Sequence, residues 1–224
     1  MQPPAPEHAE ISLDFSHVTT WVFDLDNTLY PPAARLFDQI EQRMTDWVMD
    51  ALKVDRKEAD RLRALYWRDH GTTLAGLMRN HGVDPGPYLS YVHEIDLGGL
   101  VPDRGLADHI AALPGRKIVY TNGSAPYAQR VTAARGLEGL FDAFYGVEHA
   151  QFHPKPDRRA FEVVFALDGL DPQRAAMFED DPRNLSVPHA MGLMTVHVAE
   201  TALPQDHIHY HTDDLAGFLS CLRG

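Results

Sequence analysis

The sequence predicts an α/β fold: a doubly wound parallel sheet with an all-helical segment inserted after its first strand. Two observations support this prediction. Short apolar runs alternate with helical patterns over residues 98–224, as they do in βαβ units. A stretch with only helical periodicity, residues 33–97, separates this alternation from the first apolar run. We therefore expect an α/β core formed by residues 1–32 and 98–224, and a helical domain formed by residues 33–97.

The first strand is expected around Val18–Phe23, and four helices are expected after it. In the first helix, apolar residues recur at helical spacing with charged residues between them. The second begins after Asp55, a favourable N-cap residue, and ends at Gly71. The four expected helices lie in residues 35–52, 55–71, 72–82 and 84–95.

Four further strands are expected after residue 98, each a short apolar run bounded by turn residues or acids. These strands lie in residues 116–123, 143–147, 175–181 and 194–198. Helical segments are expected between them, in residues 105–113, 125–137, 156–170 and 182–193. Strands that alternate with helices in this way form parallel sheets covered on both faces.

Composition narrows the classes of partner. The formal net charge of −12 disfavours nucleic-acid polymers and anionic membranes as partners. No apolar run approaches the roughly 20 residues that span a bilayer. The first ten residues are Pro-rich and acidic, unlike a signal peptide, and are expected to form a loose tail. Cys221 is the only cysteine, so an intrachain disulfide is impossible, and we expect a cytoplasmic protein.

Polar residues gather where the expected strands end. Asp24 and Asp26 follow the first strand, residues 121–124 (Thr-Asn-Gly-Ser) follow the second, and residues 179–181 (Glu-Asp-Asp) end a later one. Lys155 lies on another loop, between two prolines. Because ligands bind outside the carboxyl ends of strands in open α/β sheets, we expect these segments to meet at one edge.

The chemistry of these residues suits a phosphate and a metal ion. Asp24 and Asp180 offer the hard oxygen ligands that Mg²⁺ prefers. Thr121 offers a hydroxyl, and the turn after it offers backbone N–H groups at a helix N-terminus, which suits a phosphate. Lys155 adds the positive charge that offsets the carboxylates and the phosphate.

The same segments resemble the four motifs of the haloacid dehalogenase superfamily, specifically its phosphatases with a helical cap after the first strand. "DLDNTL", "TNG", "PKP" and "EDDPRNL" match the four motifs in order. The resemblance extends over about residues 18–200. It implies a Rossmann-like core, a helical cap domain, and Mg²⁺-dependent hydrolysis of small phosphomonoesters through an aspartyl-phosphate.

The resemblance also implies catalytic roles. Asp24 corresponds to the nucleophile that attacks phosphorus, and it also binds the metal. Asp26 corresponds to the general acid and base, and its backbone carbonyl is a metal ligand. Lys155 corresponds to the lysine that steadies both the nucleophile and the phosphate.

Binding roles are implied for the remaining motif residues. Thr121 and Asn122 correspond to the phosphate-binding residues of the second motif. Asp180 corresponds to a metal ligand, and Glu179 to a neighbouring carboxylate that binds the metal through water. Asn184 is expected to support this loop.

Three segments further resemble the pyrimidine 5′-nucleotidase group: "VFDLDNTLYPP", "YWRDHGTTLAGLM" and "VEHAQFHPKPDRRAFE". The sequence departs from that group at His70, where a tyrosine is common. The resemblance implies hydrolysis of a nucleoside monophosphate such as UMP or CMP. Side chains of the cap that could reach the leaving group, or simply pack in its core, are Tyr66, Arg68, His70, Thr72, Thr73 and Tyr88.

Other functions stay open at this point. The substrate could be another phosphomonoester, such as a sugar phosphate or phosphoglycolate, and a phosphomutase would use the same residues. A haloacid dehalogenase shares the fold, but it needs neither Asp26 nor the acids at residues 179 and 180. A non-catalytic binding module would be expected to lack the nucleophile, yet Asp24 is present.

One more pattern invites a metal interpretation. His207, His209 and His211 alternate, so in a strand they would share one face. No second group of ligands with recognisable spacing accompanies them, so a functional metal site at these histidines is disfavoured.

Overall fold

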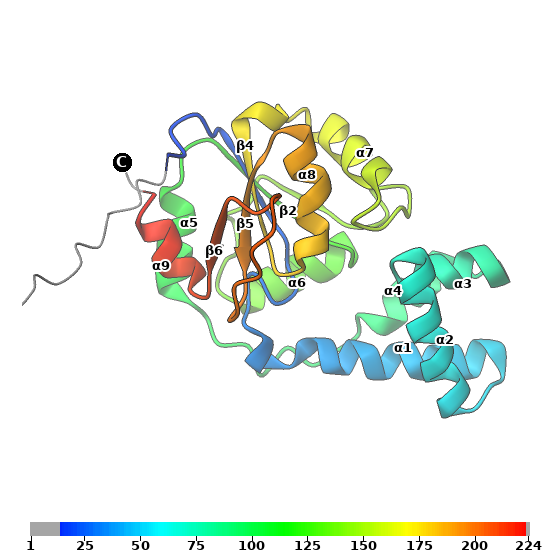
Figure 1. Ribbon diagram of the computed structural model, residues 1–224. Coiled ribbons are helices and arrows are strands. Elements are labelled where there is room, and N and C mark those ends of the chain that lie inside the picture. The colour runs from blue at the N-terminus through cyan, green and yellow to red at the C-terminus, as the bar shows by residue number, and fades with distance from the viewer. Residues whose placement is uncertain (1–13, 223–224) are drawn as a thin grey trace, which may run out of the picture.

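The computed structural model describes residues 14–222, so the tail expected at residues 1–10 lies outside the described residues. Within this range, six parallel strands form one sheet in the order β3-β2-β1-β4-β5-β6 (Figure 1). The strands are β1 (Thr20–Phe23), β2 (Arg116–Tyr120), β3 (Ala143–Tyr145), β4 (Ala175–Glu179), β5 (Met194–Val198) and β6 (Tyr210–Thr212). The predicted α/β fold with a doubly wound parallel sheet is confirmed.

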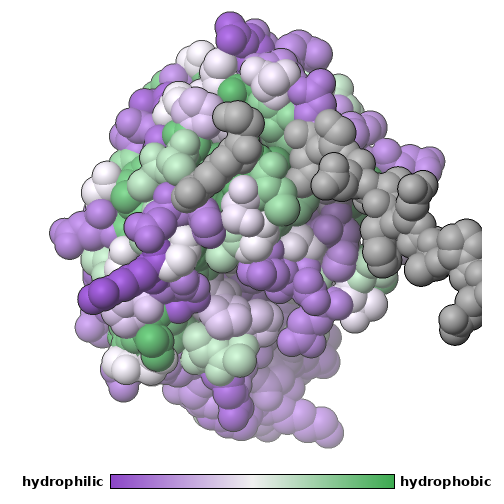
Figure 2. Space-filling model, turned by 90° about the vertical axis from the view of Figure 1, so that its left-hand side faces the viewer, coloured by the Kyte–Doolittle hydropathy of each residue, from purple (hydrophilic) through white to green (hydrophobic). Residues whose placement is uncertain are grey.

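Helices cover both faces of the sheet, so its two central strands, β1 and β4, are buried throughout. Side chains of β1 alternate between two buried clusters: Trp21 and Phe23 lie in one, and Val22 in the other. The first cluster is covered by α5 (Arg104–Ala112), α6 (Ala125–Ala134) and α9 (Leu215–Ser220), and the second by α7 (Arg158–Asp168) and α8 (Ser186–Met191). On the outer face that carries α5 and α9, apolar residues are scattered among polar ones (Figure 2).

Four helices separate β1 from α5 and lie to one side of the sheet (Figure 1). They are α1 (Leu36–Leu52), α2 (Arg56–His70), α3 (Thr73–His81) and α4 (Pro85–Val92), and we refer to them, with the residues that connect and cap them, as the insert. Side chains of Asp55 and Thr72 cap α2 and α3 by accepting backbone N–H bonds, as N-cap residues do. In the described part of the chain, no helix has both the length and the apolar character needed to cross a membrane.

The C-terminal part differs from the sequence expectation, because β6 and α9 were not predicted. Strand β6 has only three residues, all half-buried, and its apolar signal is therefore weak. Helix α9 has six residues and begins after Asp214, which accepts a bond from the backbone N–H of Gly217. The helix predicted over residues 182–193 is divided into a 3₁₀ turn, Pro182–Leu185, and α8.

Phe178 is expected to be a main contributor to the stability of the core. Its ring is fully buried on β4 and stacks on Phe23, with centroids 4.8 Å apart and planes 9° apart. Phe178→Ala should lower the free energy of unfolding by about 3–5 kcal/mol in urea denaturation, because it removes a buried ring and leaves a cavity. Leu167→Ala is the control, since Leu167 is 58% exposed, and should change it by less than about 0.5 kcal/mol. Equal losses in the two variants would contradict this assignment.

Candidate active site

The four motif segments meet at the carboxyl ends of three adjacent strands. Asp24 follows β1, Thr121 follows β2, and Glu179 is the last residue of β4. Strand β1 lies between β2 and β4, so parallel pairing brings these ends together. Lys155 reaches the same place from the loop between β3 and α7. The expected convergence at one edge of the sheet is therefore observed.

Lys155 is the centre of the site. Its Nζ atom lies 2.7 Å from Oδ1 of Asp24 and 2.6 Å from Oε2 of Glu179, and it donates to the carbonyl oxygen of Tyr120 at 3.1 Å. The lysine side chain is only 1% exposed. Burial opposes its charge, but Asp24 and Glu179 outweigh burial and raise the pKa of Lys155, so it remains an ammonium ion.

The side chain of Asn122 holds the loop that carries Lys155. Its Nδ2 donates to the carbonyl oxygen of Lys155 at 3.1 Å, and its Oδ1 accepts from the backbone N–H of Lys155 at 2.7 Å. Both polar ends of the amide are therefore engaged by the protein. Asn122 still lines the cavity, but the bonds of its side chain position Lys155.

Thr121 and the turn after it form a tight wall at the start of α6. The buried hydroxyl of Thr121 accepts a bond from the backbone N–H of Gly123 at 2.9 Å. A Cβ atom at Gly123 would lie 3.1 Å from Cδ1 of Tyr127 and 3.3 Å from Oγ1 of Thr121, so only glycine fits without displacement. The wall thus presents a hydroxyl beside a helix N-terminus, a combination that suits an anion.

Three carboxylates form a cluster that could hold a metal ion. Carboxylate oxygens of Asp24, Glu179 and Asp180 all lie within 4.8 Å of one another. Burial and the neighbouring negative charges raise the pKa of Asp24 to about 8, and burial raises those of Glu179 to about 7 and Asp180 to about 6. Lys155 supplies one positive charge, which leaves an excess of two negative charges when all groups are ionised. A hard divalent cation fits this donor set in both chemistry and charge.

Asp26 occupies a separate position. Its Oδ1 accepts hydrogen bonds from the hydroxyls of Tyr30, at 2.6 Å, and Tyr127, at 2.9 Å. Burial raises the pKa of Asp26, and the two hydroxyl bonds oppose that rise. Among the described residues, its carboxylate is not part of the acidic cluster. Neither tyrosine was predicted as a partner of Asp26, although Tyr30 lies only four residues after it in the sequence.

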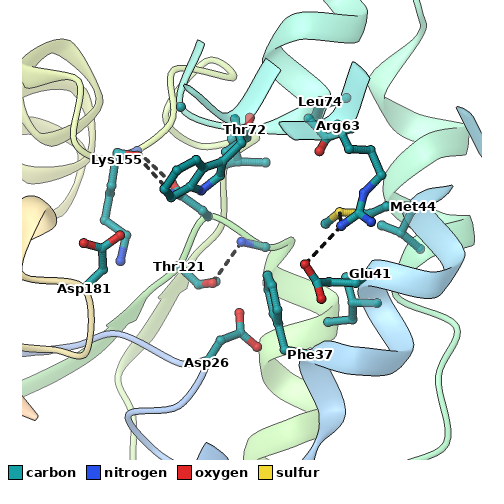
Figure 3. Close-up of a pocket in the computed structure, with 18 of the residues that line it drawn as sticks. Asp26, Phe37, Glu41, Met44, Arg63, Thr72, Leu74, Thr121, Lys155 and Asp181 are labelled. Carbon is teal, nitrogen blue, oxygen red and sulfur yellow. Dashed lines mark hydrogen bonds and ion pairs between the residues drawn. The ribbon is translucent and has the colours of Figure 1, made fainter. Parts of the chain in front are cut away.

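A cavity of about 500 Å³ lies between these loops and the insert. In Figure 3, Asp26 and Thr121 face Phe37, Glu41 and Arg63 across it. Its floor is the charged end of the sheet, and its roof is mostly apolar apart from Arg63, which pairs with Glu41 and Asp60. Side chains of the insert in the roof include Phe37, Ile40, Glu41, Met44, Arg63, Trp67, Leu74 and His93.

Half of the cap residues singled out in the sequence line this cavity. Those that do are Thr72, Thr73 and Tyr88. The other three have partners within the insert and lie outside the lining. They are Tyr66, bonded to His81; Arg68, paired with Asp69; and His70, bonded to Asn80.

A charged pair in the roof escaped the sequence analysis. Arg63 donates to Oγ1 of Thr45 at 2.8 Å and to Oε1 of Glu41 at 3.2 Å, and its side chain is only 17% exposed. Charged residues on amphipathic helices usually face solvent, so the sequence carried no signal for this arrangement.

A cation–π contact joins the insert to the core at the rim of the cavity. The guanidinium carbon of Arg183 lies 4.1 Å from the ring centroid of Trp67, a cation–π geometry. Arg183 is paired with Asp181, which also caps the following 3₁₀ turn. Asn184, buried in that turn, lines the cavity. The insert and the fourth motif therefore touch directly.

The alternating histidines do not converge. Nε2 of His207 lies 2.8 Å from the carbonyl oxygen of Pro182, and Nε2 of His211 lies 2.8 Å from that of Ala199. Nδ1 of His209 lies 2.8 Å from Oγ1 of Thr195. Over residues 14–222, the one group of side chains close enough together to hold a metal ion is the acidic cluster, and each of the three histidines instead has a neighbouring oxygen as its partner.

The chain matches the model of a known protein family over most of its length. A model of the haloacid dehalogenase-like hydrolases matches residues 18–192. Phosphate metabolism protein 8 of Saccharomyces cerevisiae is 28% identical over 176 residues, which are 71% of this chain and 54% of the yeast protein. The chain thus spans about half the length of that relative. Enolase-phosphatase E1 of a Bradyrhizobium species is 26% identical over 199 residues, 82% of each chain.

Solved structures agree on the fold. A HAD phosphatase from Thermococcus onnurineus has a TM-score of 0.64 at 16% identity, over 92% of this chain and 99% of that one. L-2-haloacid dehalogenase from Xanthobacter autotrophicus has a TM-score of 0.57 at 16% identity, with the same coverage. These likenesses extend to the fold alone. Because the family model covers most of the chain, the protein belongs to the haloacid dehalogenase-like hydrolases.

Proposed function

We propose that the protein is a phosphomonoester hydrolase that forms an aspartyl-phosphate on Asp24. The observation that carries this proposal is the placement of the Asp24 carboxylate. It is bonded to Lys155, lies within 4.8 Å of the carboxylates of Glu179 and Asp180, and lines a cavity together with Asp26 and Thr121. A nucleophile, a cation, an acid and an anion-binding turn thus surround one space, which is the set of groups that phosphoryl transfer requires.

The proposed reaction has two steps, transfer of the phosphoryl group to Asp24 and its hydrolysis by water. Lys155 holds Oδ1 of Asp24, and the carboxylate attacks phosphorus, so that an O–P bond forms at Asp24 and the bond to the leaving oxygen breaks. Asp26 gives its proton to that leaving oxygen. Asp26 then takes a proton from water, which attacks phosphorus and releases inorganic phosphate and free Asp24. Thr121 and the N-terminus of α6 bind the phosphoryl oxygens.

Mg²⁺ is the metal that we propose for the acidic cluster. Asp24, Asp180 and the backbone carbonyl of Asp26 would hold it, and when bound it would offset the negative charge of the carboxylates and the phosphate. Glu179 has a supporting role, because its Oε2 is bonded to Lys155 and its Oε1 accepts the backbone N–H of Asp181 at 3.2 Å. Both of its oxygens are engaged, which favours contact with the metal through water.

For the substrate, we propose a pyrimidine nucleoside 5′-monophosphate, with residues 33–97 acting as a cap domain over the leaving group. The roof combines the flat rings of Phe37 and Trp67 with the polar side chains of Arg63 and Thr72. Such a wall suits a base, which has an apolar face and a polar edge. A volume of about 500 Å³ is within the range of small-molecule sites.

Phosphate release from a panel of esters tests the reaction and the substrate together. With Mg²⁺ present, we expect UMP and CMP to be hydrolysed faster than AMP, GMP, sugar phosphates or phosphoglycolate. Asp24→Asn should abolish release because it removes the nucleophile, and a chelator should do the same. The assay measures inorganic phosphate, with Leu167→Ala as a control of unchanged activity, since Leu167 is exposed on α7 outside the cavity.

Each contrary outcome points to a different function. Release mainly from sugar phosphates or phosphoglycolate would keep the reaction and overturn the nucleotide assignment. Return of the phosphoryl group to another position of the substrate would identify a phosphomutase. Halide release from 2-chloropropionate, with no phosphate released from any ester, would identify a dehalogenase.

The acidic cluster also predicts how stability depends on pH. Asp24, Glu179 and Asp180 have pKa values raised to about 8, 7 and 6, so the folded protein holds these protons more tightly than the unfolded chain does. Their contribution to stability is therefore present at low pH and is lost as the pH rises through these values. In chelator, the free energy of unfolding should fall between about pH 5 and pH 8, by on the order of 1 kcal/mol per pH unit.

Mg²⁺ should reverse this loss, because a ligand that binds only the folded state stabilises it. The gain in the free energy of unfolding should be larger at pH 8 than at pH 5, since protons compete with the metal for the same carboxylates. Asp180→Asn, as the matched control, should reduce both the pH dependence and the response to Mg²⁺. A gain from Mg²⁺ that is equal at the two pH values would rule out this cluster as the metal site.

A further inference from the structure

Two buried tyrosines from separate segments of the chain meet on one oxygen of Asp26. Tyr30 lies in the loop after β1, and Tyr127 lies in the first turn of α6. Their hydroxyls donate to Oδ1 of Asp26 at 2.6 Å and 2.9 Å, and both residues are 1% exposed. A short acidic side chain at the edge of a cavity is thereby held from two directions.

This geometry makes the two oxygens of Asp26 unequal. Because both tyrosines donate to Oδ1, that oxygen is an acceptor whether or not the carboxyl is protonated. A proton carried by Asp26 is then placed on Oδ2. Asp26 lines the cavity, so the tyrosines fix which oxygen can exchange a proton with a bound molecule.

The insert in turn holds Tyr127. His93, at the C-terminal end of α4, stacks on the Tyr127 ring with centroids 4.4 Å apart and planes 7° apart. Nδ1 of His93 lies 3.0 Å from Oγ of Ser124, and the histidine is buried. On the neighbouring turn, a Cβ atom at Gly123 would already lie 3.1 Å from the Tyr127 ring, so little space remains for the ring to shift. The position of Tyr127 thus depends on where the insert sits.

We propose that Tyr30 and Tyr127 are positioning residues that orient the carboxyl of Asp26 for proton delivery to the leaving oxygen, and that His93 ties this orientation to the insert. The proposal rests on the phosphohydrolase function proposed above. The tyrosines contact the acid and are not placed on the substrate. Their effect is therefore confined to the step in which Asp26 moves a proton.

A merely structural role makes a different prediction. Loss of packing or of a buried hydrogen bond would affect all substrates alike. Loss of orientation at Asp26 would matter only for a leaving group that must be protonated as it departs. The leaving group of 4-nitrophenyl phosphate, 4-nitrophenolate, departs readily as an anion. The leaving group of benzyl phosphate, of similar size, is an alkoxide that must be protonated as it departs. The ratio of the two rates isolates the proton transfer.

The experiment measures kcat/KM for these two esters with Mg²⁺, because kcat/KM reports the steps up to the first irreversible bond cleavage. Asp26→Asn should reduce kcat/KM for benzyl phosphate by about 10²–10⁴-fold and affect 4-nitrophenyl phosphate far less. Tyr127→Phe and Tyr30→Phe keep the buried rings and remove one hydroxyl each. Each should lose about tenfold on benzyl phosphate and less than about twofold on 4-nitrophenyl phosphate, mostly through kcat. His93→Ala should give the same pattern with a smaller loss.

A double-mutant cycle tests whether Tyr127 acts through Asp26. In the Asp26→Asn background, Tyr127→Phe should cause no further loss on benzyl phosphate, because the acid that it positions is already absent. The matched control is Tyr145→Phe, which also removes a tyrosine–carboxylate bond, the one to Asp168 at 3.0 Å. The Tyr145 side chain does not line the cavity, so this variant should leave both rates unchanged.

The outcomes separate the two proposals. Equal losses on the two esters, or a Tyr127→Phe loss that persists beside Asp26→Asn, would overturn the positioning role and leave the phosphohydrolase intact. A wild-type protein that releases phosphate from neither of these esters, nor from any ester in the panel, would overturn the proposed function and the positioning role with it. The expected leaving-group pattern in both tyrosine variants, absent in Tyr145→Phe, would support the positioning role.

Discussion

The site depends on the ion pairs that the buried ammonium group of Lys155 forms with two carboxylates. The ammonium group lies against Asp24 and Glu179 at the carboxyl end of β1, and Asp180 completes a group with more negative than positive charge. Removing such charges from water is costly, so the arrangement persists only because each group has partners and because the loop of Lys155 is held by Asn122. The remaining excess of negative charge is what makes a divalent cation a fitting occupant.

The parallel sheet explains how residues so distant in the chain come to share one space. Strand β1 pairs with β2 on one side and β4 on the other, so their carboxyl ends emerge together. The insert leaves the core just after β1, next to Asp24, and its four helices form the roof of the cavity. The charged floor and the separate roof would allow the proposed chemistry and the proposed choice of leaving group to reside on different elements.

Asp26 lies where these two parts meet. Tyr30 holds it from the loop after β1, and Tyr127 holds it from α6. The insert touches the core through His93 on Tyr127 and through Trp67 beneath Arg183. The group proposed to move the proton is therefore in contact, through one aromatic ring, with the element proposed to cover the substrate. In the proposed reaction, the same placement of the insert would cover the leaving group and orient Asp26.

The sequence alone predicted the α/β fold, the helical insert and the motif residues that meet at the sheet edge, because period, turn chemistry and order along the chain are local properties. It missed β6 and α9, which are too short to carry a clear pattern. It also missed Tyr30 and Tyr127 on Asp26, and Arg63 with Glu41 in the roof. A tyrosine in a core and a charged residue on a helix look the same in sequence whether or not they face a cavity. Which of these side chains face the cavity is decided only by the packing of the insert on the core. That packing brings together two surfaces, and the sequence pattern of one says nothing about the other.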